Sequence, residues 1–202
     1  MVVVSAAVEG LLDEAVAKRL IVQAGASPGS IYGKNGKGTL RSRIAGYNNA
    51  AWHALWLVIV DLDNDAPCAP EFRQTWLPSP AQHLCFRIAV HEIESWLLAD
   101  KEQLARFLSV PVARVPNTPE DLADPKKEMV GVASSSRSRP IREDMVPRPG
   151  SGRSVGPAYT SRLIEFTQSR WRPMIARRYS ESLRGAMDCL GQLVNAGNRA
   201  LG

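Results

Sequence analysis

The sequence is poor in cysteine and has no cysteine motif. Its 202 residues include three cysteines, Cys68, Cys85 and Cys189, which lie far apart and form no CxxC pair. This spacing excludes a zinc knuckle and predicts no disulfide framework. We therefore expect three separate structural thiols and a reducing, cytoplasmic compartment.

Long apolar runs are also absent. No run of 18 or more apolar residues occurs, so no transmembrane span is expected. The opening MVVVSAAVEG has no basic segment and reaches Glu9 too early for a signal peptide. The residues are 45% hydrophobic and 22% charged, which is typical of a globular protein and argues against wholesale disorder.

Charge is distributed unevenly along the chain. Residues 1–125 carry 11 Lys/Arg and 14 Asp/Glu, whereas residues 126–202 carry 14 and 6. The net charges are therefore −3 and +8. An acidic half beside a basic half suits a cation site close to a surface that holds a polyanion, although basic surfaces also occur in proteins that bind no nucleic acid.

Apolar runs alternate with helical patterns in the first 108 residues. We expect strands at 2–8, 30–32, 55–60 and 84–90, and helices at 11–24, 39–53, 92–108, 157–171 and 181–196. This alternation predicts an α/β fold, with a mostly parallel sheet, helices on both faces and a C-terminal helical extension. The expected parts are a core at 1–108, a Pro/Ser/Arg-rich loop region at 109–157 with at most one short helix near 119–131, and C-terminal helices at 158–202 packed on the core.

Acidic residues follow the ends of two expected strands. Glu9 closes the first strand, Asp61 closes the strand at 55–60, and Asp63 lies two residues later. Alternate residues of an extended segment point the same way, so Asp61 and Asp63 can face one point. Carboxylates that converge without basic partners need a divalent cation, and oxygen ligands select Mg²⁺ or Mn²⁺. A solvated acidic turn is the structural alternative for DLDND at 61–65.

Further acids lie near the same expected edge of the sheet. Asp13 is on the first turn of the first helix, and Glu92 and Glu94 open the third. Each is also explained by the preference of carboxylates for helix N-termini. They are candidates for additional metal ligands.

Three segments resemble the Toprim domain, the catalytic module that topoisomerases and bacterial primases share. These are VEGLLDE at 8–14, VIVDLDND at 58–65 and AVHEIESWLLAD at 89–100. The segments resemble most a group of small bacterial Toprim-like proteins related to overcoming-lysogenization-defect nucleases. The resemblance implies that Glu9, Asp61 and Asp63 hold Mg²⁺, and that Asp13 with Glu92 or Glu94 helps to bind a second ion. It covers about half of the chain.

Basic residues supply candidate contacts to a phosphate backbone. Lys34 and Lys37 lie in the Gly-rich stretch GKNGKG, and Lys126 and Arg153 lie in the basic half. A flexible, solvated loop is the alternative for the two lysines of GKNGKG. No aromatic residue is interspersed among the basic residues from 126 to 153, so base stacking is not indicated.

These features favour a Mg²⁺-dependent nuclease or related phosphodiester-transfer enzyme of bacterial defence or nucleic-acid processing, with Glu9, Asp61 and Asp63 as catalytic residues. One alternative is a non-catalytic Toprim-like protein that binds nucleic acid or a nucleotide within a larger complex. Another is a hydrolase of small phosphoesters. A protein partner or a second copy of the chain is left open.

Overall fold

A computed structural model describes residues 1–201, which form two compact units. The first unit combines residues 1–90 with the chain from Ser182 onward, and the second is His91–Glu181. This division differs from the expected boundaries at 108 and 157. The chain leaves the sheet unit directly after the last strand and rejoins it with its final helix.

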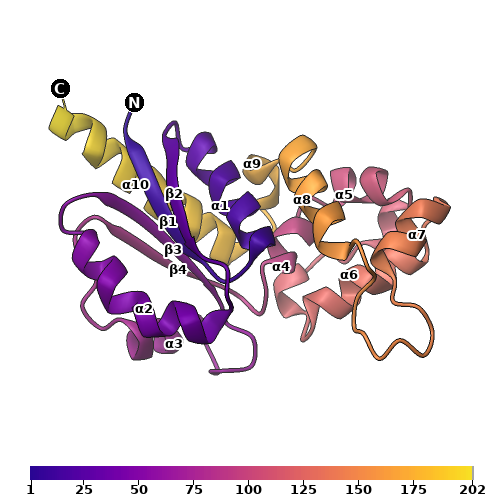
Figure 1. The fold of residues 1–202 in the computed structure, drawn as a ribbon. Coiled ribbons are helices and arrows are strands. Elements are labelled where there is room, and N and C mark those ends of the chain that lie inside the picture. Colours follow the sequence, from indigo (N-terminus) through magenta and orange to yellow (C-terminus); the bar gives the residue numbers. More distant parts are fainter. Residues whose placement is uncertain (202) are drawn as a thin grey trace. The chain divides into compact units, whose positions relative to one another are not determined.

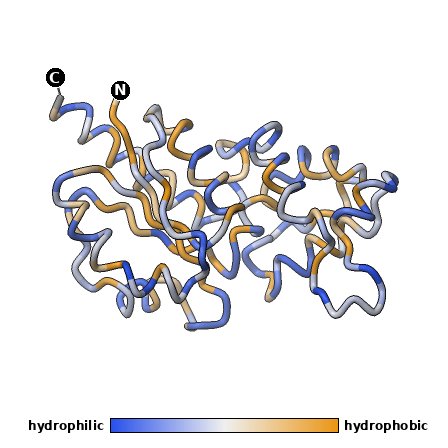
Figure 2. Tube along the Cα trace, viewed as in Figure 1, coloured by the Kyte–Doolittle hydropathy of each residue, from blue (hydrophilic) through white to orange (hydrophobic). Residues whose placement is uncertain are grey.

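The first unit contains one four-stranded parallel sheet. Its strands are β1 (Val3–Val8), β2 (Ser27–Gly33), β3 (Leu55–Asp61) and β4 (Leu84–Ala89), in the order β2-β1-β3-β4. Every residue of β3 before Asp61 is buried, as expected for a central parallel strand. Figure 2 shows the N-terminal strand, β1, as hydrophobic. The predicted α/β class and parallel sheet are confirmed.

Helices cover both faces of this sheet, as predicted (Figure 1). Helices α2 (Lys37–Ala50) and α3 (Ala69–Trp76) share one buried cluster with the side chains of one sheet face. Helices α1 (Leu11–Gln23) and α10 (Glu181–Leu201) lie on the other face. Helix α3 lies between the strands expected at 55–60 and 84–90, where the sequence predicts no helix.

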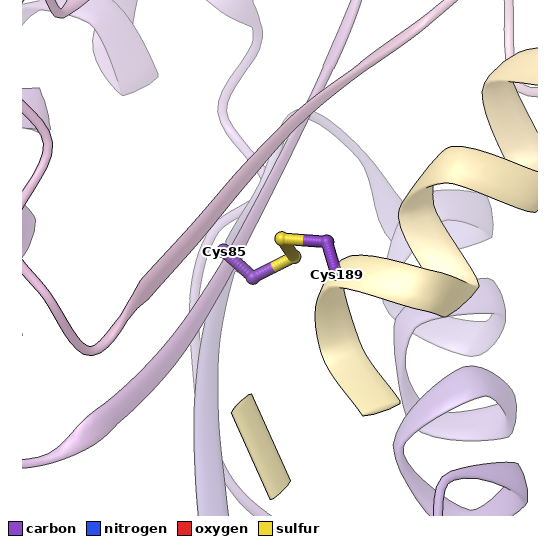
Figure 3. The surroundings of a disulfide bond; sticks show 2 residues. All are labelled: Cys85 and Cys189. Carbon is purple, nitrogen blue, oxygen red and sulfur yellow. A yellow bond between two sulfur atoms is a disulfide. The ribbon is translucent and has the colours of Figure 1, made fainter. Parts of the chain in front are cut away.

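A disulfide joins Cys85 of β4 to Cys189 of α10, with a Cα–Cα distance of 5.9 Å (Figure 3). The expectation of three separate thiols is therefore wrong, and only Cys68 is free. The two cysteines are 104 residues apart in the sequence, because the whole second unit lies between them. The packing of α10 against the sheet brings them together, and sequence spacing carries no sign of it.

The second unit is helical. Its elements are α4 (Glu94–Leu98), α5 (Lys101–Leu108), the 3₁₀ turns η1 (Val112–Arg114) and η2 (Pro119–Asp121), α6 (Pro125–Ser134), α7 (Arg139–Met145), α8 (Tyr159–Ser169) and α9 (Pro173–Ala176). Two predictions were wrong here. The single helix at 92–108 is two helices, and the loop region at 109–157 contains two helices and two 3₁₀ turns.

The break between α4 and α5 coincides with a buried ion pair. Asp100 lies at the N-cap of α5 and is completely buried. Its carboxylate accepts hydrogen bonds from the backbone N–H of Arg172 at 2.8 Å and from the Arg172 Nη2 at 2.7 Å. A buried carboxylate needs such partners, so the chain turns at Asp100 to supply them.

No helix among the described residues is both long enough and apolar enough to cross a membrane, in agreement with the sequence.

Candidate functional site at the carboxyl edge of the sheet

Glu9 and Asp61 meet at the carboxyl edge of the sheet. Glu9 follows β1 and Asp61 ends β3, and these are neighbouring parallel strands. The Glu9 Oε1 accepts a hydrogen bond from the backbone N–H of Asp61 at 2.8 Å. The predicted convergence of these two strand ends is therefore present, through the main chain of Asp61.

The surroundings of Glu9 favour its protonated form. Burial, with smaller contributions from the charges of Asp13 and Asp63, raises the pKa of Glu9 to about 7. The hydrogen bond from Asp61 and the charge of Lys37 act in the opposite direction. Three carboxylates and one ammonium group thus influence one another at this edge, and Glu9 changes charge near neutral pH.

Asp63 lies in the turn after β3, which agrees with the structural alternative for DLDND and not with an extended segment. Strand β3 ends at Asp61, and Asp63 has a left-handed backbone with φ of 48°. The alternation expected of an extended segment therefore does not extend to Asp63. Its carboxylate is 45% exposed and pairs closely with the Lys37 Nζ.

Lys37 supplies the positive charge of the site. Its Nζ contacts Asp63 Oδ2 and lies 2.8 Å from Asp65 Oδ2, and the ammonium group lies 5.6 Å from the centre of the Phe72 ring. Asp65 has no role among the sequence predictions, and Lys37 is predicted as a phosphate contact or as part of a flexible, solvated loop. The alternating acids of DLDND were the available signal for Asp65.

The turn between β2 and α2 brings Lys34 and Lys37 to this edge. The backbone N–H groups of Lys34 and Gly36 donate to the carbonyl oxygens of Val8, at 2.9 Å, and Glu9, at 3.0 Å. The Lys34 Nζ lies 3.2 Å from Glu14 Oε2. Both lysines therefore pair with acids of their own unit, and their contact with nucleic acid stays a prediction.

Asp13 is buried on the first turn of α1, with 6% of its surface exposed. A Cβ atom at Gly10 would lie 3.1 Å from the Asp13 Oδ2, so the glycine leaves room for this carboxylate beside the start of the helix. The charges of Asp13 and Asp63 both act on Glu9, which also contacts the main chain of Asp61, so these residues lie near one another at the carboxyl edge of the sheet.

Glu92 and Glu94 belong to the second unit and have partners there. Glu92 accepts hydrogen bonds from the backbone N–H and the Nζ of Lys126, at 2.8 and 2.6 Å. Glu94 is 2% exposed and accepts a hydrogen bond from the Tyr159 hydroxyl at 3.1 Å. Burial raises the pKa of Glu94 to about 7 against the opposing charge of Lys126. Their assignment to a second metal ion stays a prediction, as does the phosphate contact of Lys126.

Arg153, the fourth predicted nucleic-acid contact, lies exposed in the loop between α7 and α8. Its contact with nucleic acid stays a prediction.

Comparisons with models of protein families, with curated proteins and with solved structures found no match. The resemblance to Toprim domains therefore stays a prediction from the residues that carry it. Within residues 1–201, no three His, Cys, Asp or Glu side chains form a group that could hold a metal ion. In this arrangement Lys37 and the Asp61 N–H are the partners of Asp63 and Glu9.

Proposed function

We propose that this protein is a Mg²⁺-dependent phosphodiester-transfer enzyme, most specifically a nuclease, whose site is the carboxyl edge of the sheet. The observation that supports the proposal is the contact of Glu9 with the main chain of Asp61 at the edge where parallel α/β sheets bind ligands, with the charges of Asp13 and Asp63 acting on Glu9. The oxygen-only donor set fits Mg²⁺ or Mn²⁺ and is unsuited to zinc.

The exposure and charge of each acidic side chain suggest a different role in the proposed reaction. Asp63 is half exposed and Asp61 ends the central strand, so both are suited to hold a cation at the rim. A bound Mg²⁺ would polarise the phosphate and stabilise the charge on the leaving oxygen. Glu9, with a pKa of about 7, is suited to accept and return a proton at neutral pH.

Lys37 is central to this proposal because it already neutralises the acids. Its ammonium group must leave Asp63 before that carboxylate can hold a divalent cation. Once released, the same ammonium group is available to a substrate phosphate at the same edge. Lys37 would therefore pair with Asp63 in the metal-free protein and with a substrate phosphate when the acids hold a cation.

The test compares wild type with the double variant D61A/D63A in Mg²⁺ and Mn²⁺, on single-stranded and double-stranded DNA and RNA. We expect wild type to cleave at least one substrate and the double variant to lose at least about 100-fold in rate, with unchanged circular dichroism. The control E71A removes an exposed acid of α3 in the same unit and should cleave like wild type. Cleavage that survives in D61A/D63A would refute this site.

The ion pair between Lys37 and Asp63 favours one second candidate, a non-catalytic protein that binds nucleic acid or a nucleotide. In that case Lys37 neutralises the acids permanently. Wild type would then bind nucleic acid without cleaving any of the four substrates, and Mn²⁺ titration would detect no binding at the edge.

A further inference from the structure

The loop between α7 and α8 carries two arginines whose charge is not compensated. Arg148 and Arg153 are both exposed, and neither guanidinium group has an ion pair or hydrogen bond within the described chain. Both line a cavity of about 410 Å³ together with Ser151, Val155 and Pro157. Figure 1 shows this loop extending from the helices of the second unit, and Figure 2 shows it as largely hydrophilic.

Neighbouring arginines of the same unit differ in this respect. Arg139 pairs with Glu143 at 2.7 Å, and Arg162 pairs with Asp144 at 2.7 Å. The acids closest to the loop in sequence are thus already neutralised. No other acid occurs before Glu165, so the loop presents a local excess of positive charge.

Two glycines shape the loop around the cavity. Gly150 and Gly152 have φ of 75° and 65°, the left-handed region that other residues avoid. A Cβ atom at either position would meet nothing within 4 Å, so packing does not explain these glycines. The turn they permit, closed by the Ser151 N–H donating to the Arg148 carbonyl at 3.1 Å, brings both arginines to one cavity.

We propose that this cavity binds a phosphate group of a nucleic-acid backbone, held by Arg148 and Arg153 with the Ser151 hydroxyl. The planar guanidinium group donates two parallel hydrogen bonds to phosphate oxygens, and serine hydroxyls commonly complete such contacts. No aromatic side chain is among the described residues that line the cavity, so the contact selects the backbone rather than a base. The choice of nucleic acid as ligand rests on the proposed function.

The test measures binding of fluorescent, single-stranded and double-stranded DNA and RNA, each 30 nucleotides long. EDTA is present so that no metal-dependent cleavage occurs. We expect R148Q/R153Q to bind about tenfold or more weakly than wild type at 100 mM salt. The slope of log K against log salt should become less negative by about 1 to 2, as expected for the loss of two phosphate contacts. The charge-matched control R114Q/R139Q removes two other exposed arginines of the same unit and should stay within about twofold of wild type.

Several outcomes would overturn the inference. Equal weakening in the two double variants would mean that only net charge matters. Unchanged binding in R148Q/R153Q would remove the site, and binding of inorganic phosphate or ATP without any nucleic acid would contradict the backbone ligand. The proposed function can fail independently of this site. If neither wild type nor any variant cleaves nucleic acid, but R148Q/R153Q binds it more weakly than wild type, the loop site is supported and the nuclease activity is refuted.

Discussion

The Glu9 carboxylate accepts its hydrogen bond from the main chain of Asp61, at 2.8 Å, rather than from a side chain. The position of Glu9 is therefore set by the pairing of β1 with β3 and survives any change of the Asp61 side chain. Because burial dominates its surroundings, Glu9 is close to the boundary between neutral and charged at physiological pH.

This boundary makes the stability of the metal-free protein depend on pH. The pKa of Glu9 is raised to about 7 in the folded state, so the folded state holds this proton more tightly than the unfolded state. The resulting stabilisation is complete below about pH 4.5 and is lost as pH rises through about 7. In EDTA, the unfolding free energy of wild type should fall between pH 5 and 8, and in E9Q this fall should be smaller by about 1–2 kcal/mol. This difference is smaller than the energy equivalent of the full pKa shift, because Glu9 keeps some contact with solvent.

Urea unfolding at both pH values measures this difference. Glutamine retains the oxygen that accepts the Asp61 N–H, so the fold should be unchanged. Glu94 in the second unit has a similarly raised pKa and supplies a residual pH dependence in E9Q. An identical decline in wild type and E9Q would show that Glu9 is already charged when folded.

The convergence of Glu9 and Asp61 was predictable because it depends on two rules that sequence exposes. Continuous apolar runs identified β1 and β3, and parallel strands end at one edge. The position of Asp63 was not predictable, since its left-handed backbone is set by the turn after β3. The pairing of Lys37 with Asp63 spans 26 residues and depends on how the loop from β2 lies over the sheet.

Lys37 and a divalent cation should compete for the same carboxylates under the proposed function. K37M should therefore bind Mn²⁺ several-fold more tightly than wild type, while the metal-free variant becomes less stable because Glu9, Asp63 and Asp65 lose a compensating charge. Isothermal titration with Mn²⁺ measures the affinity. K34M is the matched control, since Lys34 pairs with Glu14 instead. Equal Mn²⁺ affinity in K37M and wild type would mean that Asp63 is not a ligand of the cation.

The disulfide predicts a redox-dependent stability. Cys85 and Cys189 join β4 to α10, and the second unit lies between them in the sequence. Reduction therefore removes a crosslink that restricts the unfolded chain. We expect C189S to cost about 2–4 kcal/mol relative to oxidised wild type and to abolish the effect of reductant on Tm. The control C68S changes the free, exposed cysteine and should behave as wild type. Titration of denatured, oxidised wild type should find one thiol; three would show that the bond is absent.

Proline explains most of the helices that sequence reasoning missed. The sequence predicts no helix around Pro70, Pro140 or Pro173, yet these prolines lie in the first turns of α3, α7 and α9. Pro125 begins α6, which overlaps the one short helix expected near 119–131. The first helical positions need no N–H partner, so proline is well tolerated there. Asp124 before Pro125 was an available signal, since its carboxylate caps α6 by accepting the Lys127 N–H at 2.7 Å.

The buried pair of Tyr159 and Glu94 predicts a pH-dependent cost in the second unit. Y159F leaves the Glu94 carboxylate without the hydroxyl that donates to it at 3.1 Å. We expect a loss of about 1–3 kcal/mol at pH 8, where Glu94 is charged, and a smaller loss at pH 5.5, where it is protonated. Urea unfolding at the two pH values tests this. Y179F, which changes an exposed tyrosine of the same unit, should have no effect at either pH.

Two glycine substitutions should have opposite signs, because one glycine shapes the site and the other does not. Gly33, at the end of β2, has φ of 87°, and a Cβ atom there would lie 2.1 Å from the Val8 carbonyl oxygen. G33A must therefore displace the turn that carries Lys34 and Lys37 over the sheet edge, and we expect it to cost more than about 1 kcal/mol. Gly46 lies exposed within α2 with nothing within 4 Å of its Cβ position, so G46A should stabilise by about 0.5–1 kcal/mol. Thermal unfolding compares the two. Equal changes in stability for G33A and G46A would mean that the conformation of Gly33 does not hold the turn between β2 and α2 against Val8 and Glu9. The explanation given for the position of Lys37 beside Asp63 would then be wrong.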